Sequence, residues 1–196
     1  MCVKLSVSLL MAAKWKNFRP LSELVYVPER EVTALSSTVL KELRNQASQT
    51  SEKKSRILLH GNAHNDLHEM VITHSKGTYI RPHLNESSAK SFLVFDGEMV
   101  VCYFDKHGTV IDRFLLQELG NEGDFFLRFE QPIFHTIVVV SETVTFLETV
   151  RGPHRKTQYA GFAPMPGDER ADQYFAQLES DSRDWIHSQD EHGAAE

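Results

Sequence analysis

The sequence predicts a mainly β fold, a barrel of many short strands with one helix before it and one after it. Runs rich in Val, Ile, Phe and Thr recur at close spacing between Arg56 and Arg151, and turn signals rather than helical segments separate them. On both sides of this region the apolar residues recur every three or four positions, which is typical of amphipathic helices.

Residues 1–28 are predicted to form an N-terminal arm, which Pro20 and Pro28 punctuate. Residues 29–55 follow as a helix and a linker. The apolar positions of this helix are Val32, Leu35, Val39, Leu43 and Ala47. Because these intervals are three and four residues, they favour a helix, and the polar stretch Ser48–Lys54 favours a linker after it.

Residues 56–164 are predicted to form the barrel. Its strand-like runs are Val71–Thr73, Phe92–Phe95, Glu98–Phe104, Val110–Leu116, Phe125–Phe129 and Ile137–Val150. Asp96-Gly97 stands between two of these runs, and Asp-Gly in that position predicts a hairpin.

Residues 165–188 are predicted to form a C-terminal helix that packs outside the barrel. Asp168 and Glu169 favour its start, because acidic side chains stabilise a helix N-terminus. The apolar stripe of this helix is Ala171, Tyr174, Phe175, Leu178, Trp185 and Ile186. Residues 189–196 are polar and are predicted to be a disordered tail.

Composition excludes several classes of protein. The net charge of −6 gives no basic face for nucleic acid, and no stretch approaches the roughly 20 apolar residues of a membrane span. Only two cysteines are present, Cys2 and Cys102, so a disulfide framework is not expected and the cytoplasm is the predicted location.

The most informative stretch runs from Gly77 through His83 to Gly97, and Pro132 and His135 follow in the second half of the chain. Together these residues resemble the two motifs of the cupin superfamily. The resemblance implies a double-stranded β-helix, also called a jelly-roll barrel. In that family two His, a Glu and a later His hold a divalent transition metal such as Fe, Mn, Ni or Zn in the barrel mouth.

The sequence departs from the cupin pattern at two of the four ligand positions. Asn85 stands where the second His is expected, and Lys90 stands at the Glu position counted back from Gly97. An Asn carbonyl is a weak ligand, and a protonated Lys offers no lone pair. His83 and His135 therefore remain as the strong metal ligands.

Three interpretations stay open. A metal could still bind at His83 and His135, with Asn85, Glu86 or His68 as an additional ligand. Alternatively, the Lys90 ammonium could replace the metal and suit an anionic ligand such as a phosphate or a carboxylate. The third interpretation is a local slip in the alignment.

Within the cupins the chain resembles the WbuC family over roughly residues 33–170. The segments that carry this resemblance are Arg56–His60, Asp66–Met70, Thr78–His83, Val101–Asp105, Phe134–Thr136, Glu148–Pro153 and Phe162–Pro164. The resemblance implies a cupin-fold metalloprotein associated with bacterial surface-polysaccharide biosynthesis.

The expected function is the binding of a small molecule, either a sugar or an anion, by a degenerate metal site. The predicted pocket residues are Tyr79, His83, Asn85, Lys90 and His135, and His135 is the candidate catalytic residue. Two alternatives remain, namely a cupin enzyme (a metal-dependent oxygenase or a sugar isomerase or epimerase) and a non-catalytic structural partner. A homodimer is expected, because pairing covers open sheet edges.

Overall fold

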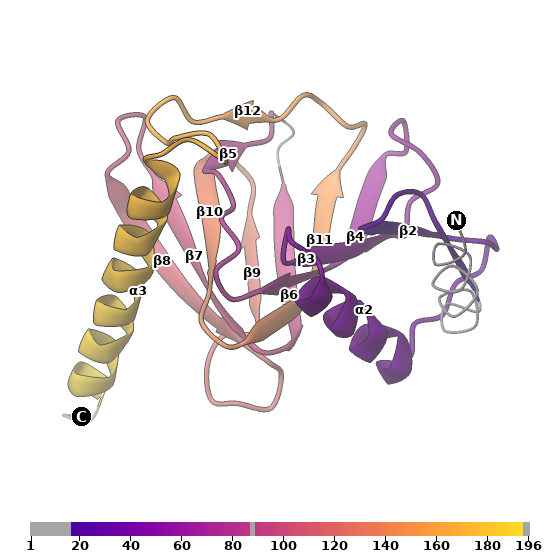
Figure 1. Ribbon diagram of the computed structural model, residues 1–196, viewed down its shortest axis with the longest axis horizontal. Coiled ribbons are helices and arrows are strands. Elements are labelled where there is room, and N and C mark those ends of the chain that lie inside the picture. Colours follow the sequence, from indigo (N-terminus) through magenta and orange to yellow (C-terminus); the bar gives the residue numbers. More distant parts are fainter. Residues whose placement is uncertain (1–16, 87–88, 194–196) are drawn as a thin grey trace, which may run out of the picture.

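The computed structural model describes residues 17–86 and 89–193. Figure 1 shows two facing β-sheets with a helix outside each of them. The larger sheet has the order β1-β2-β3-β4-β11-β6-β9 and the smaller has the order β12-β5-β10-β7-β8. The strands of the larger sheet are β1 (Phe18–Pro20), β2 (Val25–Pro28), β3 (Lys54–Leu58), β4 (Leu67–Ser75), β6 (Lys90–Asp96), β9 (Phe126–Phe129) and β11 (Thr143–Arg151). Those of the smaller sheet are β5 (His83–Leu84), β7 (Glu98–Phe104), β8 (Val110–Gln117), β10 (Phe134–Val139) and β12 (Gln158–Tyr159).

The eight strands from β4 to β11 form a jelly roll. Four of them make the order β4-β11-β6-β9 and the other four make β5-β10-β7-β8, so successive strands along most of the chain lie in opposite sheets. Two interlocked four-strand sheets of this order are the double-sheet jelly roll of cupins and related proteins. The predicted fold class, mainly β with a barrel and two outer helices, is confirmed.

The Asp96-Gly97 hairpin prediction is wrong about pairing. The turn is present, and Gly97 has a φ of 84°, but β6 and β7 belong to different sheets and do not pair with each other. A Cβ at Gly97 would clash with the Thr143 carbonyl oxygen, so the glycine allows the chain to cross tightly between the sheets. Local turn chemistry cannot distinguish this crossing from a hairpin.

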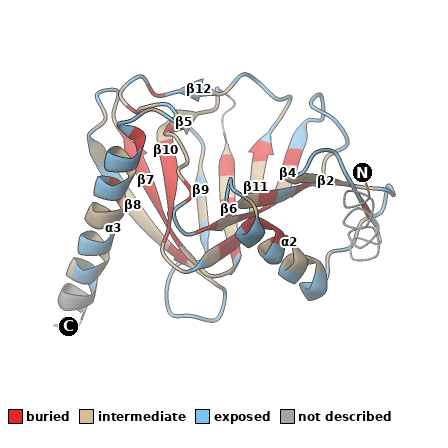
Figure 2. Ribbon diagram, viewed as in Figure 1, coloured by how far each residue is buried: buried red, intermediate tan, exposed pale blue. Residues whose placement is uncertain are grey.

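The main core lies between the sheets. It contains Phe92, Val94, Met99, Val101, Ile137, Val144 and Phe146 among others, and Figure 2 shows these strands as the most buried part of the molecule. A second cluster joins Leu43 of helix α2 (Ser37–Gln49) to Ile57 and Val71. A third joins Leu178, Trp185 and Ile186 of helix α3 (Ala171–Gly193) to the outer face of β7 and β10. Each helix therefore seals the outer face of one sheet.

The predicted segments begin and end differently from the observed ones. Helix α2 begins at Ser37, because the Ser36 hydroxyl accepts a hydrogen bond from the Val39 amide, and Val32 stays 88% exposed. Residues 18–28 of the predicted arm add β1 and β2 to the barrel sheet. Helix α3 continues to Gly193, past the predicted start of the tail. Residues 1–16, which hold Cys2 and the rest of the arm, and residues 194–196 lie outside the described residues.

The long helix α3 is amphipathic rather than uniformly apolar. Within residues 17–86 and 89–193, neither helix has the length and apolar content needed to cross a membrane.

Candidate functional site

Strand pairing places one row of side chains on the inner face of the larger sheet. His68 of β4 is opposite Val150 of β11, and Val150 is opposite Lys90 of β6. In the next row Glu148 is opposite both Met70 and Phe92. Because directly opposed residues share a face of a sheet, Lys90 and Glu148 are diagonal neighbours inside the barrel.

His83 and His135 face this row from the smaller sheet. They are directly paired between β5 and β10, and their ring centroids are 4.7 Å apart. The Nδ1 atom of His83 lies 3.0 Å from the Arg81 carbonyl oxygen, and that of His135 lies 2.9 Å from the Ile133 carbonyl oxygen. A carbonyl only accepts, so each Nδ1 carries the proton and each Nε2 of the neutral ring keeps its lone pair.

Lys90 uses one of these lone pairs. Its Nζ donates to the His135 Nε2 at 3.1 Å and to the Glu148 carboxylate at 3.4 Å, and the Lys90 side chain is only 3% exposed. Burial and the Lys90 charge lower the pKa of His83 to about 4. Burial, then Lys90 and His83, hold the pKa of His135 well below its usual range. Both imidazoles are therefore neutral at pH 7, beside a buried ammonium that Glu148 compensates.

The residues of this cluster do not fit a resident transition metal. The Lys90 ammonium donates to the nitrogen that would coordinate the metal, and a second cation at that point would be repelled. No group of three or more His, Cys, Asp or Glu side chains in the described part of the chain is arranged to hold a metal ion. The only carboxylate named in this cluster, Glu148, is paired with Lys90, so the two imidazoles have no third described ligand arranged with them, and two are too few for a stable site.

The other predicted residues lie in different places. Asn85 lines the same cavity, and its Oδ1 is buried without a hydrogen-bond partner within the described residues. Tyr79 lines the cavity too, but its hydroxyl donates to the Pro164 carbonyl at 2.9 Å, and burial raises its pKa to about 12. Glu86 is exposed, and it is not among the residues that line the cavity.

His68 belongs to a separate group of histidines that also line the cavity. Its ring stacks on His60 at a centroid distance of 4.1 Å and lies 6.2 Å from His154. The Nε2 of His68 donates to the Asn65 carbonyl at 3.1 Å. His68 is therefore not brought to the His83–His135 pair as an additional ligand.

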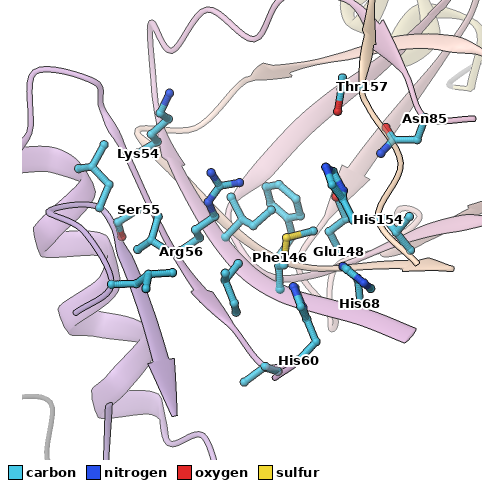
Figure 3. A pocket seen from close by; sticks show the side chains of 18 of the residues that line it. Lys54, Ser55, Arg56, His60, His68, Asn85, Phe146, Glu148, His154 and Thr157 are labelled. Carbon is cyan, nitrogen blue, oxygen red and sulfur yellow. The ribbon is translucent and has the colours of Figure 1, made fainter. Parts of the chain in front are cut away.

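The cavity that contains both histidine groups is large and basic. Its volume is about 1430 Å³, above the range of ordinary small-molecule pockets. Eight Lys or Arg residues line it against four Glu, although the whole chain has a net charge of −6. Figure 3 shows the cavity from close by, with Lys54 and Arg56 on one side and Asn85 and Glu148 on the other. This concentration of positive charge favours an anionic ligand.

Sequence reasoning did not identify Glu148, Arg56 or His74 as site residues. Glu148 shares the parity of Val144, Phe146 and Val150 on β11, and His74 shares that of Met70 and Ile72 on β4. A charged or polar residue at an otherwise apolar, inward-facing parity is the signal that could have found both. The sequence around Arg56 gives no such signal. Its side chain faces the cavity because β3 pairs with β2 and β4, and this pairing cannot be read from the sequence of β3.

The strand order and the cavity between the sheets define a double-sheet jelly-roll barrel, a fold class that includes the cupins. The model of a domain of unknown function, DUF6016, matches residues 35–116, which is less than half of the chain. No curated protein matches the sequence.

Solved structures similar to this chain include an oxidase, a decarboxylase and a peptidase. An oxalate oxidase is 11% identical, with 68% of this chain and 74% of that chain covered and a TM-score of 0.45. The Mn(II) oxalate decarboxylase of Bacillus subtilis is 17% identical (48% and 24% covered, TM-score 0.40). Peruvianin-I, a cysteine peptidase from Thevetia peruviana latex, is 15% identical (49% and 56% covered, TM-score 0.41).

The chain spans just over half of peruvianin-I and about a quarter of the decarboxylase. The fold is assigned from the strand order. No activity is inferred from these structures, whose TM-scores are all below 0.5. None of these matches identifies the WbuC family that the sequence resembles.

Proposed function

We propose that this chain is a metal-independent cupin that binds a small anionic ligand, with the Lys90 ammonium in the place of the metal. The observation that carries the proposal is the position of Lys90 Nζ, which is buried and 3.1 Å from the His135 Nε2. A fixed ammonium supplies the positive charge that a bound cation would otherwise supply.

The donors and acceptors of the cluster suit such a ligand. An ammonium has three N–H donors, and His135 and Glu148 take two of those of Lys90. The third is left for a phosphate or carboxylate oxygen. The neutral His83 keeps an unprotonated Nε2 that can accept a hydrogen bond from a sugar hydroxyl. A polar, sugar-linked anion would satisfy both groups.

The biological context rests on the sequence resemblance. WbuC-type proteins are associated with bacterial surface-polysaccharide biosynthesis, so we propose a ligand of that biosynthesis. A cytoplasmic location is proposed separately, from the presence of only two cysteines. We also propose a homodimer, because pairing of two chains would cover open sheet edges. A monomeric mass in light scattering would argue against it.

A sugar isomerase or epimerase is the second candidate function. The observation that favours it is the pair of neutral imidazoles at a centroid distance of 4.7 Å, because a neutral Nε2 can remove a proton as a general base. Lys90 already donates to the Nε2 of His135, the residue expected from the sequence, so His83 is the base in this candidate function. Turnover of nucleotide sugars that disappears in His83→Ala would support it. The metal-dependent oxygenase is not proposed, because it needs at least three protein ligands.

Metal loading of the wild type and of Lys90→Glu tests the main proposal. The substitution places a carboxylate beside His83, His135 and Glu148, so we expect stoichiometric Mn²⁺ or Fe²⁺ in Lys90→Glu and almost none in the wild type. Elemental analysis after dialysis against free metal gives the measurement. Lys106→Glu, in an exposed turn, is the matched control for the charge change. A wild type that retains one metal ion per chain would overturn the proposal.

A further inference from the structure

The cavity has a second basic corner on β3 and β4, distant from Lys90. Lys54 is directly opposite His74, and Arg56 is directly opposite Ile72. Ile72 and His74 continue the inner face of β4 on which Met70 lies, so Lys54 and Arg56 also face the cavity, and all of these residues line it. The Lys54–Arg56–His74 group is called the outer corner below.

The charges of the outer corner are only partly compensated. Lys54 pairs with Glu52 at 2.7 Å, but both side chains are about half exposed, so water screens this pair. The Arg56 guanidinium forms no hydrogen bond or ion pair with any residue in 17–86 or 89–193. Arg56 therefore has five N–H donors, arranged as a fork, that face a cavity without a protein acceptor.

His74 adds a buried polar atom to the same corner. Its Nδ1 is inaccessible to water and has no hydrogen-bond partner among the described residues. Burial, followed by the charges of Lys54 and Arg56, lowers the pKa of His74 to about 3. A buried polar atom without a partner is rare and calls for an explanation. The His74 ring itself lines the cavity beside Arg56, so a ligand oxygen bound to the guanidinium would lie against this ring.

The outer corner lies too far from Lys90 for a single small anion to reach both. Three strand spacings separate β3 from β6 through β4 and β11, which is about 14 Å across the sheet. Lys90 is also four residues along β6 from Val94, which shares the row of Arg56 through Ile72 and Phe146. The surface between the two ends is apolar, with Met70, Ile72 and Phe146 lining the cavity there.

We propose that the outer corner is a second anion subsite that binds a phosphate group. The ligand is then an extended phosphate ester, whose phosphate contacts Arg56, Lys54 and His74 while its other polar end reaches Lys90. This inference rests on the proposed function for the inner end, but the subsite itself can be tested alone. A phosphate suits the corner because its oxygens can accept the two parallel N–H bonds of a guanidinium.

Calorimetric titration of the full-length protein with inorganic phosphate, and then with the longer phosphate ester UDP-glucose, tests the subsite. Loss of a charge-assisted hydrogen bond predicts that Arg56→Met weakens both ligands about tenfold or more. His74→Phe should weaken phosphate about threefold or more, and its thermal midpoint should stay unchanged or rise, because the unpaired Nδ1 is removed. A purely structural His74 would give the opposite result, with a lower midpoint and unchanged affinity.

Arg128→Met is the matched control. Arg128 carries the same charge on β9 but is exposed and paired with Glu130 outside the cavity, so its loss should leave phosphate binding unchanged. Phosphate binding that survives Arg56→Met but is lost in Lys90→Met would overturn the outer subsite and leave the proposed function standing. UDP-glucose binding that needs Arg56 but is unaffected when Lys90→Met is combined with Glu148→Met would retain the subsite and refute the inner site instead.

Discussion

The two ends of the cavity contain similar residue types, a cationic side chain beside neutral histidines, but their contacts differ. At the inner end Lys90 is 3% exposed and bonded to His135 and Glu148. At the outer end Arg56 is exposed and lacks a described partner, and the His74 Nδ1 is unsatisfied. A charge with internal partners contributes to the stability of the fold, whereas an unpaired charge at a cavity wall contributes chiefly to ligand binding. This difference can be tested by measuring stability and ligand affinity separately.

The largest expected effect is on stability at the inner end. Lys90→Met leaves the mostly buried Glu148 carboxylate without its cation, and we expect a loss of about 3 kcal/mol in the free energy of unfolding. Urea denaturation at pH 7 measures this. Arg56→Met should change the same quantity by no more than about 0.5 kcal/mol.

The double variant Lys90→Met with Glu148→Met serves as the control, because it removes both charges and should recover most of the lost stability. Equal stability of Lys90→Met and Arg56→Met would remove the distinction between the two ends.

The next largest effect is the contribution of His74 to the pH dependence of the free energy of unfolding. Its folded pKa of about 3 is below the ordinary value of 6.5, so the unfolded state binds a proton between these values that the folded state does not. The contribution of neutral His74 to the free energy of unfolding is therefore fully present above pH 6.5. As the pH decreases below that value, this contribution falls by at most about 1.4 kcal/mol per pH unit.

Unfolding free energies of His74→Phe between pH 7 and pH 4 check this prediction. The variant should have a shallower decline than the wild type, with the remaining slope coming from His83 and His135, whose pKa values are also lowered. Parallel declines in the two proteins would contradict the assigned pKa.

The smallest effect is expected at Glu52. Its pair with Lys54 is exposed, so Glu52→Gln should change the free energy of unfolding by less than about 0.5 kcal/mol. Removal of this carboxylate should nevertheless strengthen phosphate binding several-fold at low salt, and 1 M NaCl should abolish most of the gain. An affinity that does not respond at low salt would place phosphate away from Lys54.

Much of the fold could be predicted because its signals are local. Apolar spacing predicted both helices, and the β-rich runs with their turn signals predicted the strands between them. The pairing of strands was not predicted, as the Asp96-Gly97 turn illustrates. A glycine with positive φ suits a hairpin and a sheet-to-sheet crossing equally well, and only contacts with β11 and β10 distinguish them.

The candidate site divides in the same way. His83, His135 and the unusual Lys90 could be found in the sequence because they fall on a motif of fixed spacing. The roles of Glu148, Arg56 and His74 depend on strands that are distant in sequence, so spacing alone does not bring them together.

The sequence by itself determined the β-rich barrel, its flanking helices and the lysine at a position where the motif that it resembles has a glutamate. Only the tertiary structure decided that the ammonium of that lysine meets an imidazole nitrogen and a carboxylate, and that a second basic corner opens into the same cavity. The physical reason is that side-chain direction follows from local backbone geometry, whereas charge compensation depends on which distant strands become neighbours.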